Sequence, residues 1–198
     1  MLQYINLPHE LLLKDGIDIK TQKEWEIMYS LKDDRIIFPI RDEIGSLVGV
    51  KARATNNEEE NKYIYHYPVS KSKMLFGLYK TLPYIKEKNE AIVFEAEKST
   101  IKSWGYGYKN SVAIGGKTIS EAQAMLLAKL QVPIVLAFDK DCTKEDIKKS
   151  ANMLRKYFVE IYIIYDKKNI LDEKESPVDN LTKWRYLYKN HKYKIGGV

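Results

Sequence analysis

The chain has 198 residues, of which 44% are hydrophobic, so it can bury an ordinary core and is not expected to be disordered. It contains no run of about eighteen apolar residues and no basic-then-apolar leader at its start, which excludes a membrane span and a signal peptide. One cysteine excludes an internal disulfide and a cysteine-rich zinc site, so we expect a cytoplasmic protein without a membrane partner. The net charge of +6 permits a polyanionic partner without requiring one.

The first third of the chain predicts short helices followed by an antiparallel sheet. Residues 1–30 are interpreted as one or two helices, with Thr21-x-x-Glu24 spaced like a capping box. Two β-rich runs, 34–41 and 47–53, flank a short turn that contains glycine, which predicts a β-hairpin. Residues 62–68 alternate as in an edge strand.

Beyond residue 90 the pattern changes to alternating strands and helices. Apolar runs begin at Ala91, Ser111, Pro133 and Val159. Ser120 and Gln123 have capping-box spacing at the start of one helical run between them. Such an alternation is the βαβ signature, which favours a parallel sheet with helices on both faces.

The fold class is therefore predicted as α/β, a parallel sheet with flanking helices preceded by a smaller α+β subdomain. We place the basic α+β subdomain at residues 1–85 and the α/β domain at 86–168. Residues 169–198 are expected to form a short helical segment and a mobile basic tail after His191.

Two of the predicted strands end in carboxylates. Glu95 directly follows one apolar run, and Asp139 and Asp141 end another. Because the carboxyl ends of neighbouring parallel strands share one edge, the three acids are expected to converge there. Three hard oxygen ligands suit Mg²⁺ or Mn²⁺. An isolated Asp-x-Asp is more often a helix cap beside a solvated acid, so Glu95 is what makes a metal site the favoured interpretation.

Two other uses of these residues are excluded by spacing. An EF-hand loop that starts at Asp139 needs glycine at its sixth position, where this chain has Lys144. Gly116-Lys117-Thr118 is similar to the end of a P-loop, but Ser111 stands where the earlier glycine belongs. Gly115 and Gly116 are therefore expected to form a tight turn near the acidic edge.

The same residues resemble a Toprim domain, which bacterial-type primases, topoisomerases, and recombination and nuclease proteins share. The resemblance rests on Glu95, the Gly115-Gly116 turn and the run 137–141 before a helix. A second, ordered set resembles the N-terminal subdomain of the bacterial and phage DNA primase catalytic core. It comprises residues 35–42, Gly45, Gly49, Arg53, Lys62-Tyr63 and 71–79.

The resemblance implies a DNA primase core, a nucleotidyltransferase that makes RNA primers on single-stranded DNA from nucleoside triphosphates. Glu95, Asp139 and Asp141 would be both catalytic and metal-binding, holding Mg²⁺ or Mn²⁺ for two-metal phosphoryl transfer. Six basic residues would line a groove for template and nucleotide phosphates, unless they only form a solvated face. They are Arg35, Lys51, Arg53, Lys62, Lys71 and Lys73.

The chain departs from the primase pattern at two places. Ala96 and Ser99 stand where primases often carry a glycine and a later aspartate. A further acidic motif, usually Asp-Pro, appears as residues 175–179, so Glu175 and Asp179 are weak candidates for an additional metal ligand.

Several interpretations stay open on these grounds. The chain is a fragment, a reduced primase of a phage or mobile element, or the front of a primase-helicase, with a replicative helicase as a candidate partner. The alternatives are a Toprim nuclease that uses the same acids to cleave DNA, and a non-catalytic module that binds DNA or docks onto a helicase.

Overall fold

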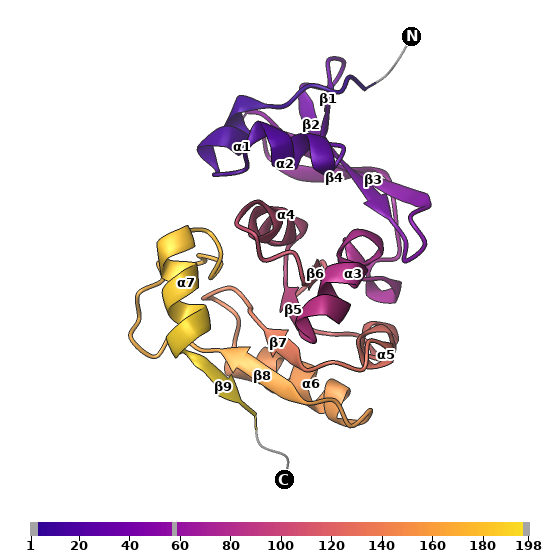
Figure 1. Ribbon diagram of the computed structural model, residues 1–198. Helices are drawn as coiled ribbons and strands as arrows, with labels where there is room; N and C mark the ends of the chain where they lie inside the picture. Colours follow the sequence, from indigo (N-terminus) through magenta and orange to yellow (C-terminus); the bar gives the residue numbers. More distant parts are fainter. Residues whose placement is uncertain (1–3, 57–58, 196–198) are drawn as a thin grey trace.

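The computed structural model in Figure 1 describes residues 4–56 and 59–195, which build two sheets. One is four-stranded, in the order β1-β2-β3-β4, and the other is five-stranded, in the order β6-β5-β7-β8-β9. This arrangement confirms the predicted fold class, a mainly parallel α/β sheet preceded by a smaller α+β unit. No helix in these two ranges is long and apolar enough to cross a membrane.

The four-stranded sheet is antiparallel throughout. Its strands and the helices before them are α1 (Glu10–Lys14), α2 (Ile19–Glu24), β1 (Met28–Ser30), β2 (Arg35–Arg41), β3 (Leu47–Ala54) and β4 (Tyr63–Tyr67). The predicted hairpin is confirmed as β2 and β3, with Phe38 opposite Lys51. The predicted capping box at Thr21 is wrong, because Asp18 caps α2 and accepts a 2.6 Å hydrogen bond from the Thr21 amide. Thr21 is buried inside the helix instead.

The segment between the sheets runs through η1 (Lys71–Lys73) into helix α3 (Leu78–Lys88). Phe76 pairs with Ala113 through two backbone hydrogen bonds, so this segment joins the edge of the second sheet. Gly77 follows with φ +84°, and a Cβ there would lie 2.8 Å from the Trp25 ring. Helix α3 extends through residue 85, where the first subdomain is expected to end, to Lys88.

The five-stranded sheet has four parallel strands and one antiparallel edge strand. Its elements are β5 (Ala91–Phe94), α4 (Glu97–Gly105), β6 (Ser111–Ala113), α5 (Glu121–Lys129), β7 (Ile134–Leu136), α6 (Lys144–Arg155), β8 (Ile161–Ile164), α7 (Leu181–Asn190) and β9 (Lys192–Lys194). The capping box of Ser120 and Gln123 is confirmed at the start of α5.

The tail expected to be mobile after His191 is ordered as β9 through Lys194. It pairs with β8, and Lys192 and Lys194 form ion pairs of 2.7 Å with Glu90 and 2.6 Å with Glu160. These charges attach the basic strand to the start of β5 and β8. The end of the expected tail, residues 196–198, lies outside the described residues.

Helices cover both faces of the second sheet because successive strand residues point to opposite sides. Val93 and Leu136 pack into a cluster with α3, α5 and α6, whereas Phe94 and Val135 pack against Trp184 of α7. Helix α4 lies between the two sheets (Figure 1). Its Trp104 belongs to a third cluster that includes residues of β2, so the two sheets share apolar packing that fixes their relative position.

Candidate active site

The predicted acids meet at the carboxyl edge of the second sheet. β5 and β7 are parallel neighbours, with Val93 opposite Leu136, so the residues that follow them lie side by side. Glu95 follows β5 directly, and its Oε1 accepts a 3.0 Å hydrogen bond from the Asp139 amide. The Gly115 amide, at φ +66°, donates to the Glu95 carbonyl over 2.8 Å. The tight glycine turn therefore lies at this edge, as the spacing predicts.

Burial and mutual repulsion make these carboxylates hard to ionise. Burial, together with the charges of Asp139 and Asp141, raises the pKa of Glu95 to about 7. Burial and the charges of Asp179 and Asp141 likewise raise the pKa of Asp139 to about 6, although a hydrogen bond from Ser176 opposes the rise. Repelling carboxylates of this kind are stabilised by a proton, a lysine or a divalent cation.

One carboxylate oxygen in this group lacks a hydrogen-bond partner. Asp139 Oδ1 is buried without a donor, whereas buried polar atoms normally have one. Mg²⁺ and Mn²⁺ prefer carboxylate oxygens as ligands. The unpaired Asp139 oxygen and the neighbouring Glu95 carboxylate therefore fit such an ion. Within residues 4–56 and 59–195, however, no three His, Cys, Asp or Glu side chains already form a metal-binding group.

Asp141 lies on the rim of the acidic edge. It is exposed, and its Oδ2 is 3.7 Å from Lys117 Nζ in the loop after β6. It is near enough to raise the pKa values of Glu95 and Asp139, in both cases after burial as the main cause. The structure thus joins Glu95 and Asp139 directly and leaves Asp141 beside them.

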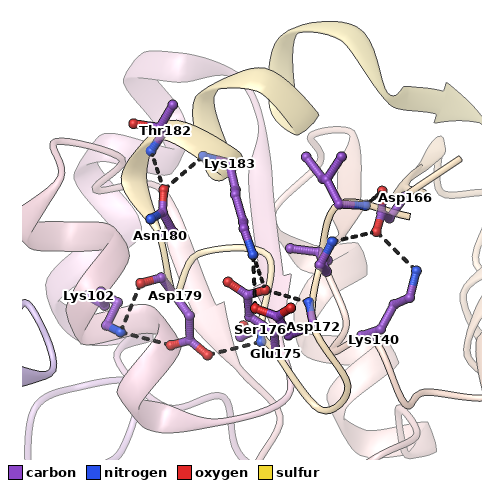
Figure 2. A network of polar contacts seen from close by, with 12 residues as sticks. Lys102, Lys140, Asp166, Asp172, Glu175, Ser176, Asp179, Asn180, Thr182 and Lys183 are labelled. Atoms are coloured by element: carbon purple, nitrogen blue, oxygen red, sulfur yellow. Dashed lines mark hydrogen bonds and ion pairs between the residues drawn. The ribbon is translucent and has the colours of Figure 1, made fainter. Parts of the chain in front are cut away.

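The two weak candidates for an additional metal ligand, Glu175 and Asp179, lie in different surroundings (Figure 2). Asp179 is close enough to Asp139 to repel it, and so it belongs to the acidic edge. Glu175 faces elsewhere, because its carboxylate accepts a 2.7 Å hydrogen bond from Lys183 Nζ. Only one of the two therefore lies where a metal-site residue would be expected.

Three of the six predicted phosphate-binding residues are already engaged in ion pairs. Their side chains are 8%, 17% and 9% exposed, so these charges are largely withdrawn from solvent. The pairs are Arg35 with Glu59 at 3.0 Å, Lys51 with Glu97 at 2.6 Å, and Arg53 with Asp15 at 3.0 Å. The two that involve β3 connect it to α4 and to the end of α1.

The other three, Lys62, Lys71 and Lys73, are exposed. Lys71 lies next to the acidic edge, since its aliphatic chain would be 3.3 Å from a Cβ at Gly115. A pocket of about 110 Å³ opens between the first sheet and the start of α4, and Lys51, Tyr63 and Lys98 are among its lining residues. This pocket thus places basic and aromatic side chains next to Ala96, the residue after Glu95.

Sequence reasoning missed the cations on α4. Lys98 attracts both Asp139 and Asp179, and Lys102 Nζ is 2.8 Å from Asp179 Oδ1. The signal available was their spacing of four residues on a helix that begins two residues after Glu95. That spacing shows that the lysines share a face, but not which acids this face meets.

Most of the known proteins that resemble this chain are DNA primases. Residues 1–82 match the family described as "DNA primase catalytic core, N-terminal domain". The SPbeta prophage-derived uncharacterized protein YorJ of Bacillus subtilis is 29% identical over 89% of this chain and 54% of its own length. A DNA primase of Aquifex aeolicus is 32% identical over 66% of this chain and 27% of its own length. The chain thus spans about half or less of these relatives.

Solved structures show the same fold. The Aquifex aeolicus primase structure, which contains zinc-binding and RNA polymerase domains, matches 94% of this chain and 56% of that one. Its TM-score is 0.79 at 23% identity. A DnaG primase catalytic domain bound to single-stranded DNA matches 93% of this chain and 71% of that one, with TM-score 0.73 and 18% identity.

Proposed function

Because this chain has the core of a DnaG-type DNA primase, we propose that it synthesises short RNA primers on single-stranded DNA from nucleoside triphosphates. The observation that carries the proposal is the pair of Glu95 and Asp139, joined by a hydrogen bond at the carboxyl edge of the sheet, with one Asp139 oxygen left without a hydrogen-bond partner. Nucleotidyl transfer needs divalent cations at such an edge, and these acids are suited to hold them.

Glu95, Asp139 and Asp141 would hold Mg²⁺ or Mn²⁺ in a two-metal arrangement. The bound ions supply the positive charge that activates a primer 3′-hydroxyl and clamps the triphosphate. Glu95 fixes the Asp139 backbone through its 3.0 Å hydrogen bond, and the Asp139 side chain then presents Oδ1 to an ion. Glu95 is buried and Asp139 is half-buried, so their charges are screened less by water than they would be at the surface.

Single-stranded DNA is the proposed template. One of the structural neighbours is a primase domain bound to such a strand, and this chain exposes Lys62, Lys71 and Lys73, of which Lys71 lies beside Gly115 at the acidic edge. Exposed lysines attract phosphates without sequence preference, so the binding would weaken with salt. We place the protein in the cytoplasm of its host, as a phage-type primase core that works beside a replicative helicase.

Primer synthesis on single-stranded DNA with labelled nucleotides and Mg²⁺ or Mn²⁺ tests the proposal. Wild type should give short RNA products, and Asp139→Asn should lose them by about a hundredfold or more, because it removes a charge that holds the ion. Glu160→Gln is the matched control, since Glu160 is an exposed acid before β8 at the opposite edge of the sheet.

The same assay separates the other candidate functions. Shortened DNA in place of RNA would indicate a nuclease, and DNA binding without either product would indicate a non-catalytic module. Equal synthesis by wild type and Asp139→Asn would refute the metal assignment.

A further inference from the structure

Lys102 lies in an acidic region without being exposed to solvent. It extends from α4 with its side chain 4% exposed, and Nζ donates to Asp179 Oδ1 over 2.8 Å and to the Asp179 carbonyl over 3.4 Å. A buried ammonium without such a partner would cost several kcal/mol of desolvation. Lys102 and Asp179 therefore depend on each other for their charges.

Both carboxylate oxygens of Asp179 already accept hydrogen bonds from the protein. Oδ1 is taken by Lys102, and Oδ2 accepts a 3.0 Å hydrogen bond from the Ser176 amide (Figure 2). Burial raises its pKa, but the Lys102 ammonium outweighs that effect and keeps the pKa below its usual value. Asp179 thus differs from Asp139, whose Oδ1 is buried and unpaired.

The loop that carries Asp179, residues 172–180, is attached from several sides (Figure 2). The Ser99 and Ser176 hydroxyls are 3.1 Å apart in the interior, and this contact joins the loop to α4. The Lys140 amide, between the two predicted metal ligands that follow β7, donates to the Glu175 carbonyl over 2.9 Å. The loop is therefore held against the acidic edge by contacts with α4 and with the segment after β7.

From these contacts we propose that Lys102 is a resident cation that neutralises Asp179 and keeps a divalent ion from binding there, so the chain without nucleotide binds one ion, at Glu95 and Asp139. Asp179 is then not a metal ligand. This inference rests on the proposed function for the metal at Glu95 and Asp139. A second ion needed for transfer would enter with the triphosphate that it accompanies.

Titrating the metal-free chain with Mn²⁺ tests the number of bound ions without DNA or nucleotide. The electron paramagnetic resonance signal of free Mn²⁺ reports how much of the metal is not bound. Wild type should bind one ion per chain. Lys102→Met, which keeps the length but removes the charge, should bind a second ion because Asp179 is released beside Asp139. Lys102→Met combined with Asp179→Asn should return to one ion.

Two measurements make the test independent of how well Lys102→Met folds. The Lys102→Met, Asp179→Asn double variant leaves neither charge without its partner and should change the Mn²⁺ affinity by less than about twofold, whereas loss of a true ligand or its orienting partner costs about tenfold or more. Lys183→Met is the matched control, since it removes a lysine that pairs with Glu175 and Asp172 in the same loop. It should still bind one ion.

Several results would overturn the proposal: two ions on the wild type, one ion on folded Lys102→Met, or a tenfold weaker site in the Lys102→Met, Asp179→Asn double variant. A wild type that binds no Mn²⁺ would refute both this inference and the metal assignment. Expected stoichiometries without primer synthesis would refute only the priming function.

Discussion

Replacing Glu95 with glutamine should make the metal-free protein less sensitive to alkaline pH. The pKa of Glu95 rises from 4.5 to about 7 on folding, through burial and repulsion by Asp139 and Asp141. Between these two values the folded chain keeps a proton that the unfolded chain has released, so stability falls as pH rises through this window. A change of this size corresponds to roughly 3 kcal/mol at neutral pH and above.

Urea denaturation in EDTA at about pH 5 and about pH 8 measures the effect. The fall in the free energy of unfolding between these conditions should be about 2–3 kcal/mol smaller in Glu95→Gln than in wild type. The amide can still accept the hydrogen bond from the Asp139 backbone, so folding at low pH should be preserved. Titrating groups that do not interact with Glu95 are common to both proteins and cancel in the comparison.

Between the two pH values, the free energy of unfolding of the exposed control Glu160→Gln should fall by as much as that of wild type. An equal fall in wild type and Glu95→Gln would show that Glu95 ionises normally in the folded chain. That result would remove the electrostatic reason for expecting a cation at this site.

Two other predictions concern the contacts between the sheets. Lys51→Met should lower the free energy of unfolding by roughly 3 kcal/mol because it leaves the buried Glu97 unpaired. Adding Glu97→Leu should restore most of that loss. If the losses of the two single variants simply add in urea denaturation, the two residues do not form a specific pair. Gly77→Ala should cost roughly 1–3 kcal/mol, since φ is +84° and the new Cβ would lie 2.8 Å from Trp25, and an unchanged melting temperature would refute this steric argument.

Local patterns were sufficient for most of the fold. The strand and helix alternation after residue 90 and the hairpin of residues 35–54 follow from hydrophobic periodicity and turn residues, which act over a few positions. The same patterns place Glu95 and Asp139 after neighbouring strands, because parallel strands end on a common edge. Two features were predicted less well. Asp18 caps α2 in place of the nearby Thr21, and pairing with the distant strand β8 orders the basic tail as β9.

The sequence by itself determined that Glu95 and Asp139 reach the edge of the sheet, since each of them follows a strand of that sheet. Only the tertiary structure decided which cations meet them. Lys102 and Asp179 are 77 positions apart, and Lys51 and Glu97 are 46 apart. No periodicity connects residues at such separations; they meet because α4 is packed between the two sheets. Burial at that position leaves a charge in need of a partner, and Lys51 pairs with Glu97 there as Lys102 pairs with Asp179.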